Sequence, residues 1–341
     1  MDGALTEPVV HRWERLTKRQ FDALDRDRCV VLVTCSPLEV HGPHLPLGAD
    51  ALEGEGLLER MLRFLPERHR NRTFLKLPFI YTATDAVPHA GSLFFRPSTT
   101  ISVLEDLGRS LASQGFRDVL VSNFHGSPRH FLAIEDACER VTRRRGIRMV
   151  CVFSVMLSRL TGGSAELYEA LGGLPGLRRE DLIGDTHAGL VETSQLLALH
   201  PECVEKDYAT LPRRTVDGWL QERGEPLPHV ERGKPAKLSA MVKAFRGGLR
   251  FFREETYAGA PAGASAELGE HILATLATHS ADAVSEILDG TLPPEQWHSP
   301  LWPRRFIFIN PWMVRFFNRL LQVPEGVAQS VPKTPPRGTA G

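Results

Sequence analysis

The sequence has few cysteines and no pairing pattern among them. The five cysteines are an odd number, they are scattered along the chain, and no two of them form a CxxC motif. This distribution excludes a disulfide framework and is typical of small buried apolar side chains in a reducing compartment, so we expect a cytoplasmic protein. The N-terminal stretch MDGALTEPVVHRWERL contains acidic residues and no apolar segment of signal-peptide length. No stretch reaches the ~18 apolar residues of a membrane-spanning helix, so we expect no membrane association.

The sequence also lacks an excess of charge of one sign. Its 341 residues, enough for one large domain or two small ones, include 41 Lys+Arg and 41 Asp+Glu. A formally neutral chain has no long-range field that would attract nucleic acid. The basic run RVTRRRGIR (140–148) is interpreted as the solvated end of a helix. We therefore expect no nucleic-acid partner.

What the sequence does contain is an alternation of strand and helix patterns. Short β-branched runs predict strands at 29–36, 73–81, 118–124 and 148–155. Helical spacing predicts helices at 11–27, 51–65, 100–115, 129–144 and 266–288, and the charged, Pro- and Gly-rich stretch 207–235 predicts a surface excursion. This alternation indicates an α/β fold with a doubly wound, mostly parallel sheet and helices on both faces.

One stiff segment concentrates polar side chains that can bind metals. SPLEVHGPHLPLGAD (36–50) combines prolines and glycines with Glu39, His41, His44 and Asp50. It follows the buried strand predicted at 29–36, and open α/β sheets bind their ligands at this end of their strands. Burying such groups without partners would cost several kcal/mol each. We therefore expect the stiffness to hold ligands in a fixed geometry.

Two further segments carry groups of the same kind. NFHGSPRH (123–130) follows the strand predicted at 118–124, and GDTHAGLVETS (184–194) leads into a helix. Together they offer His125 and His130 from the first, and Asp185, His187 and Glu192 from the second. Imidazole and carboxylate ligands without thiolate suit zinc, manganese or iron. Asp50 could bridge two ions ~3.5–4 Å apart, the arrangement that two-metal hydrolases use.

These segments resemble a known family in order and spacing. PLEVHGPHLPLGAD, NFHGSP and DTHAGLVETS are similar to the signature segments of the creatininase (creatinine amidohydrolase) family, and YAGAPAGASAELGEHIL (257–273) is similar to its closing helix. The resemblance covers roughly residues 11–290. It implies a creatininase-like fold, two divalent metal ions per chain, with zinc expected before manganese or iron, and a homo-oligomer.

The resemblance also implies roles for individual residues. Glu39 would bind one metal and His41 the other, with Asp50 bridging them and His125 on the second metal. His187 would be the catalytic acid and base, and Glu192 a metal ligand or a catalytic group. His89, Ser127 and Asp185 are expected to bind substrate. The implied reaction is hydrolysis of a C–N amide bond, cyclic or N-formyl, in a small molecule by a metal-bridging hydroxide.

Some residues depart from the family pattern or have plain structural alternatives. Val40 stands where the family usually has Gln, and HAGSLFF (89–95) replaces its FPGT loop. Ser127 stands where creatininase itself has a glutamate ligand, so we do not expect creatinine as substrate unless Glu192 supplies that ligand. Asp185 could simply be an N-cap, and Glu192 could favour the dipole of its helix.

Three functional alternatives and three parts of the chain remain open at this point. Besides an amidohydrolase, the sequence allows a lactone- or peptide-like-bond hydrolase of a biosynthetic pathway, or a non-catalytic oligomeric scaffold.

Residues 1–292 are expected to form the catalytic domain. The aromatic and Arg-rich extension 293–323, with a helix at 314–321, is expected to be a lid or a subunit contact. The tail 324–341 has the composition of a disordered segment.

Overall fold

The computed structural model describes residues 8–323 apart from 83, 162–170, 172–173, 176, 226 and 228–237, and also residue 326. Most of the tail predicted at 324–341 and part of the predicted excursion 207–235 therefore lie outside the described residues. Within the part that is described, no helix is long and apolar enough to cross a membrane.

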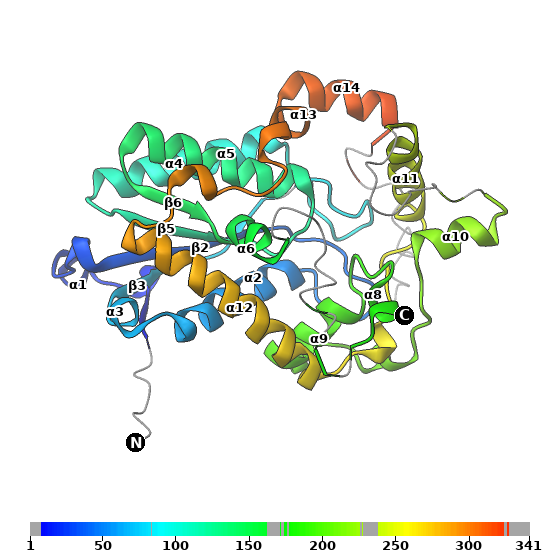
Figure 1. The fold of residues 1–341 in the computed structure, drawn as a ribbon, viewed down its shortest axis with the longest axis horizontal. Coiled ribbons are helices and arrows are strands. Elements are labelled where there is room, and N and C mark those ends of the chain that lie inside the picture. Colours follow the sequence, from blue (N-terminus) through cyan, green and yellow to red (C-terminus); the bar gives the residue numbers. More distant parts are fainter. Residues whose placement is uncertain are drawn as a thin grey trace, which may run out of the picture.

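A parallel sheet forms the centre of the molecule (Figure 1). Its strands lie in the order β1 (Val9–Arg12), β3 (Thr73–Lys76), β2 (Cys29–Ser36), β5 (Asp118–Ser122) and β6 (Arg148–Cys151), and the short β4 (Ile80–Tyr81) pairs with β2. All five strand pairs run parallel. The strand predicted at 29–36 is the fully buried central strand. Its carboxyl end therefore meets that of β5 at one edge of the sheet.

Helices cover both faces of this sheet, as predicted. Alternate side chains of β2 point to opposite faces, with Val30 and Leu32 in one apolar cluster and Val31 and Val33 in the other. The first cluster includes α2 (Ala49–Phe64), α6 (Val152–Thr161) and α12 (Ala266–Asp289), and the second includes α4 (Pro97–Ser113) and α5 (Pro128–Arg145). The α/β fold is thereby confirmed, with two separate cores held apart by the sheet.

The remaining helices are short or lie around one end of the sheet. They are α1 (Lys18–Asp22), α3 (Glu67–Arg70), α8 (Arg179–Leu182), α9 (Leu190–Leu199), α10 (Val216–Glu222), α11 (Leu238–Phe251), α13 (Arg305–Ile309) and α14 (Pro311–Leu321). Helix α9 packs beside α2 and α12. The excursion predicted at 207–235 includes α10, which buries Trp219 and Leu220.

Three predicted elements were wrong in extent. The helix predicted at 11–27 is instead the end of edge strand β1, a 3₁₀ turn at Trp13–Arg15 and the short α1, because the backbone of Val9–Arg12 pairs with β3. The strand predicted at 148–155 ends at Cys151, and α6 begins at Val152. The strand predicted at 73–81 is interrupted between Lys76 and Ile80.

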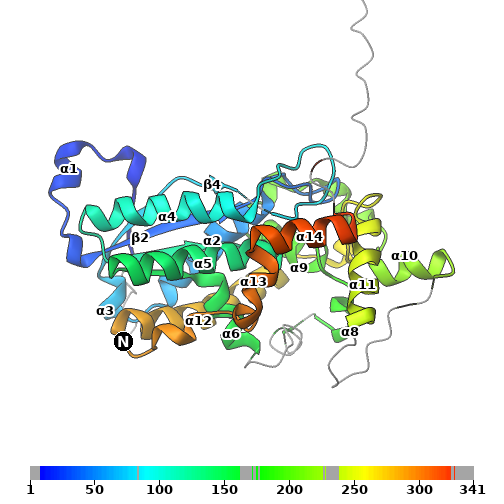
Figure 2. The same ribbon diagram turned by 90° about the horizontal axis from the view of Figure 1, so that it is seen from above.

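The C-terminal extension packs on the same cores as the rest of the chain. Trp297 belongs to the apolar cluster of α12, and Ile309 to that of α5. The helix predicted at 314–321 is α14, which begins three residues earlier at Pro311 because Asn310 caps it through the backbone N–H groups of Trp312 and Met313. Both views place the end of α14 beside α11 (Figures 1 and 2).

Candidate metal centre

The loop between β2 and α2 is fixed by backbone hydrogen bonds before any ligand is considered. The N–H of Glu39 donates to the carbonyl of Leu47 (2.8 Å), and that of Gly42 donates to Thr256 (2.8 Å). Gly42 has a φ of +65°, and a Cβ there would lie 2.7 Å from the Nδ1 atom of His44. Only glycine fits this turn without strain. The sequence-based expectation of a rigid loop agrees with this structure.

A first group of ligand atoms joins this loop to the end of β5. The Nδ1 atom of His125 lies 3.0 Å from Oε2 of Glu39 and 3.5 Å from Oδ2 of Asp50. The other ring nitrogen of His125 donates to the carbonyl of Thr84 (3.2 Å), while Oε1 of Glu39 accepts from the N–H of Val87 (2.6 Å). These contacts engage the outer atoms, so Nδ1 of His125 and Oε2 of Glu39 are left facing each other. Such outer hydrogen bonds are usual for a histidine that binds a metal.

A second group shares Asp50 with the first. The Nε2 atom of His41 lies 3.5 Å from Oδ1 of Asp50 and 3.8 Å from Oε2 of Glu192. The Nδ1 atom of His41 donates to the carbonyl of Glu39 (3.0 Å), and Oε2 of Glu192 accepts from the N–H of Ala188 (2.5 Å). The two oxygens of Asp50 thus face different groups, which is the geometry of a bridging carboxylate.

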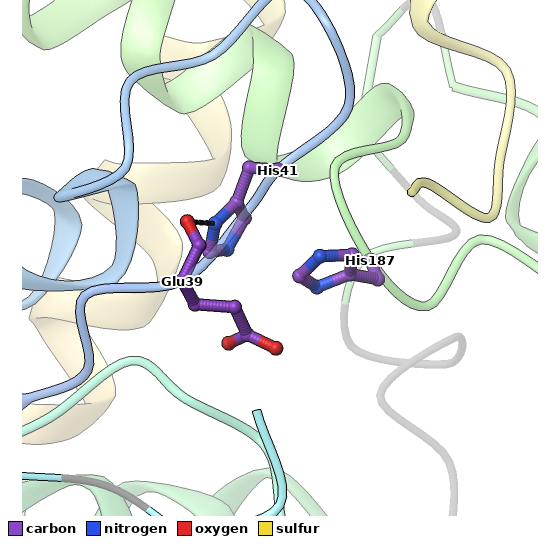
Figure 3. Close-up of side chains that lie close together, drawn as sticks. All are labelled: Glu39, His41 and His187. Atoms are coloured by element: carbon purple, nitrogen blue, oxygen red, sulfur yellow. Dashed lines mark hydrogen bonds between the residues drawn. The ribbon is translucent and has the colours of Figure 1, made fainter. Parts of the chain in front are cut away.

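His187 completes the centre from the loop before α9. Its Nε2 atom donates to the carbonyl of Val40 (2.8 Å), and its ring centroid lies 4.2 Å from that of His41. Figure 3 shows its ring facing His41 and the carboxylate of Glu39. Ligand atoms of Glu39, His41 and His187 lie within 4.8 Å of one another. Burial and the neighbouring His41 lower the pKa of His187 to about 4, so its imidazole is neutral near pH 7.

The chemistry of these donors fits divalent metal ions. Among the described residues, Oε2 of Glu39, Nε2 of His41 and Oδ2 of Asp50 are buried without a hydrogen-bond partner. Burial opposes a charge on His41, yet the carboxylates of Asp50, Glu192 and Glu39 raise its pKa to about 10. These buried carboxylates therefore favour a positive charge among them, which bound cations would supply. Nitrogen and oxygen donors without sulfur suit zinc or manganese.

All five predicted metal ligands come together, but with one difference in grouping. His125 lies with Glu39 and Asp50, and not with His41 as the resemblance implied. Glu192, and not His125, lies beside His41. The sequence could not show this, because the pairing depends on how the loop after β5 crosses that after β2.

The three residues predicted to bind substrate lie outside these groups. His89 donates through Nε2 to the carbonyl of Phe252 (3.0 Å). The hydroxyl of Ser127 donates to Oδ2 of Asp85 (3.1 Å). Asp185 accepts from the backbone N–H groups of Leu190 (2.6 Å) and Val191 (3.0 Å), so it binds the first turn of α9, although the N-cap residue itself is Gly189 and not Asp185 as the structural alternative supposed. Its carboxylate thereby positions the helix that carries Glu192.

Two more histidines near the centre have partners of their own. The Nε2 atom of His44 lies 2.9 Å from the hydroxyl of Thr193, and that of His130 donates to the carbonyl of Cys35 (3.0 Å). Burial lowers the pKa of His44 to about 4 and that of His130 to about 3, so both are neutral. Neither belongs to a ligand group among the described residues.

Sequence reasoning missed one buried acid, Glu53. It lies three residues after Asp50 in α2, on the same helix face, and its side chain is fully buried. Neither of its oxygens has a hydrogen-bond partner among the described residues. Burial, with Glu192 and Asp50 nearby, raises its pKa well above the usual value. The spacing from Asp50 was the available signal, but an acid inside an amphipathic helix is usually solvated.

Replacing Glu53 with leucine is expected to stabilise the metal-depleted protein. An unpartnered buried carboxyl costs about 1–3 kcal/mol, so the free energy of unfolding should rise by that amount. The gain should be larger at pH 8 than at pH 5, because the unfolded chain ionises Glu53 at high pH while the folded chain keeps it protonated. Urea unfolding followed by circular dichroism measures both. Glu59→Leu, which changes an exposed acid of the same helix, should have little effect, and a loss of stability in Glu53→Leu would contradict the prediction.

Comparisons with known proteins are consistent with this fold. Residues 14–284 match a family model named creatininase and described as creatinine amidohydrolase. A solved structure named as manganese creatininase is 20% identical, covers 81% of this chain and 98% of its own, and has a TM-score of 0.52. A zinc–zinc creatininase variant is 18% identical, with coverages of 81% and 98% and a TM-score of 0.54. A Bacteroides fragilis protein described as a candidate creatinine amidohydrolase is 18% identical, with coverages of 83% and 97% and a TM-score of 0.52. No curated protein matches the chain.

Proposed function

The chain belongs to the creatininase family of hydrolases acting on C–N bonds, and from this premise we propose that it cleaves an amide bond, cyclic or N-formyl, of a small molecule. The observation that carries the proposal is the pair of ligand groups that share Asp50. Glu39, Asp50 and His125 would hold one divalent ion, and His41, Asp50 and Glu192 the other. When bound, such ions supply Lewis-acid polarisation of a carbonyl group and lower the pKa of a water molecule.

The protein's own groups would manage the proton. In the net reaction a water oxygen bonds to the amide carbon, the C–N bond breaks, and the departing nitrogen takes up a proton. His187 is suited to carry that proton, because its Nε2–H is held by the carbonyl of Val40 and its Nδ1 keeps a lone pair. Its low pKa, about 4, means that it receives a proton only transiently and passes it on readily.

The substrate is proposed to be a small amide, and creatinine belongs in the substrate panel because Glu192 lies 3.8 Å from His41 and would supply the carboxylate that Ser127 lacks. Ser127 stands at the position of a glutamate ligand in creatininase itself, and here its hydroxyl binds Asp85 instead. We also propose a cytoplasmic location and a homo-oligomeric assembly, which rest on the cysteine pattern and on the family.

The function is tested by metal removal and a matched substrate panel. Wild-type protein, chelator-treated protein, and treated protein reconstituted with zinc or manganese are assayed on creatinine, N-formyl amino acids, small lactams and the matching lactones. We expect hydrolysis of amides that falls at least 100-fold after chelation and returns with metal. Hydrolysis of lactones alone would favour the lactonase alternative. No bound ion after reconstitution, with no turnover of any compound, would favour the non-catalytic scaffold.

A further inference from the structure

A cavity of about 370 Å³ lies between the segment after β4 and the C-terminal extension. Its lining includes Thr84 and Asp85 from the segment after β4, and residues of α14. The carbonyl of Thr84 is the group that orients His125, so the cavity and the centre share this segment. A substrate that reached past His125 would enter this cavity with the part that extends away from the reacting bond.

The walls of this cavity are fastened together by one buried guanidinium. Arg129, at the start of α5, donates from Nη1 to Oδ1 of Asp85 (2.9 Å) and to Oδ1 of Asn318 in α14 (2.7 Å). Asp85 also accepts from the hydroxyl of Ser127 and has a φ of +64°, a strained conformation for this residue type. These contacts hold the loop, α5 and α14 in one arrangement, so the cavity is formed in advance of binding.

The charge of the lining favours an anion. Three of its residues are arginines, Arg96, Arg129 and Arg315, against a single acid, Asp85. Because Arg129 is taken up by Asp85, the other two guanidiniums supply the uncompensated charge. Neither forms an ion pair within the part of the chain that the structure describes, and both are solvent-accessible. Guanidinium groups in this state bind carboxylates through charge-assisted hydrogen bonds.

The rest of the lining is apolar and aromatic. Phe94 and Phe95 contribute from the loop that replaces the family's usual segment, and Val314 contributes from α14. Phenyl rings provide flat surfaces against which a ring or planar chain can pack. A ligand that satisfies both parts of the lining needs an apolar, flat body and a negative group at one end.

We propose that this cavity selects substrates whose non-reacting end is an aromatic or similarly flat apolar group bearing a carboxylate. The inference rests on the proposed amide hydrolysis, because it assigns the remainder of that substrate. It makes α14 a wall of the substrate site. Arg96 and Arg315 are its carboxylate-binding residues, and Arg129 is a positioning residue that joins α14 to the loop.

The test measures binding to the metal-depleted protein, so that neither turnover nor metal binding of a carboxylate contributes. N-formyl-L-phenylalanine and its neutral carboxamide, N-formyl-L-phenylalaninamide, are titrated by calorimetry. We expect the carboxylate to bind at least 10-fold more tightly than the carboxamide, in line with charge-assisted hydrogen bonds. In Arg96→Gln/Arg315→Gln the preference should fall below 3-fold. Arg319→Gln, on the same helix but outside this lining, should retain it.

The outcomes separate this inference from the proposed function. Equal binding of both probes by the wild type, or no binding of either, overturns the inference. A preference that survives in the double variant overturns its assignment to this cavity. Selective binding without hydrolysis by the metal-loaded protein would contradict the amidohydrolase proposal while supporting the cavity. In the metal-loaded enzyme, the double variant should have a higher KM for the carboxylate than the wild type and a kcat within about 3-fold of it. The reason is that Arg96 and Arg315 bind the substrate and take no part in the reaction.

Discussion

Asp50→Ala is expected to release both metal ions and to lower amide hydrolysis by at least three orders of magnitude. Its two oxygens face different ligand groups, at 3.5 Å from His41 and 3.5 Å from His125. Alanine removes one donor from each group at once and leaves two buried groups with two side chains apiece. The rate should fall with the loss of the ions, because the side chain of Asp50 faces both ligand groups.

Metal analysis of chelator-free protein by plasma mass spectrometry measures the effect directly. We expect close to two ions per chain in the wild type and fewer than 0.2 in Asp50→Ala, with far-ultraviolet circular dichroism unchanged. Glu55→Ala, which removes a half-buried acid of the same helix that pairs with Lys76, should keep both ions. His125→Ala should release the ion held with Glu39 and retain the other. Two ions in Asp50→Ala would show that this carboxylate is not shared.

Gly269→Ala is expected to lower the free energy of unfolding by about 3 kcal/mol or more. Helices α9 and α12 cross so closely that a Cβ at Gly269 would lie 1.9 Å from the carbonyl oxygen of Ser194. A backbone carbonyl cannot rotate away as a side chain can, so the two helices must separate. Because Glu192 lies two residues before Ser194, metal binding should weaken together with stability.

Urea unfolding followed by circular dichroism, with the metal removed, measures the stability effect. Gly248→Ala is the matched control, because it also replaces a helical glycine but meets nothing within 4 Å. That variant should be stable to within about 1 kcal/mol of the wild type and gain stability if anything, since alanine favours helix more than glycine does. Equal stability of Gly269→Ala and the wild type would contradict the close crossing.

Much of the fold could be predicted because its elements have strong local patterns. The strand at 29–36 is continuous and β-branched, and it is the buried central strand. The helix predicted at 266–288 is α12, which extends one residue further to Asp289. The loop at 36–50 could be predicted to gather polar groups because they could not be buried singly, and Glu39, His41 and Asp50 do lie close together. These predictions depended on residues that are close in the sequence.

The errors arose where tertiary contacts decided between local alternatives. The sequence of residues 148–155 predicts one strand, yet Val152 and Val155 lie one helical turn apart in α6 and belong to the same buried apolar cluster. An apolar run of this length does not distinguish the two states. Asp85 was not predicted at all, because its role depends on residues far away in the sequence. Arg129 lies 44 residues after Asp85, and Asn318 lies 189 residues after Arg129.

The position of α14 bears on how the proposed reaction and the proposed substrate selectivity are distributed along the chain. The matched family region ends at residue 284 and contains every proposed metal ligand, whereas one wall of the cavity comes from residues 309–323. The proposed metal ligands thus lie wholly within the matched region, whereas the proposed substrate cavity is lined by residues of that region and by residues of the C-terminal extension. Two relatives that agree over the shared region can act on different molecules if their last helices differ. Exchange of the segment after residue 292 between such relatives would change one wall of the cavity, and so alter the substrate preference, while leaving every proposed metal ligand in place.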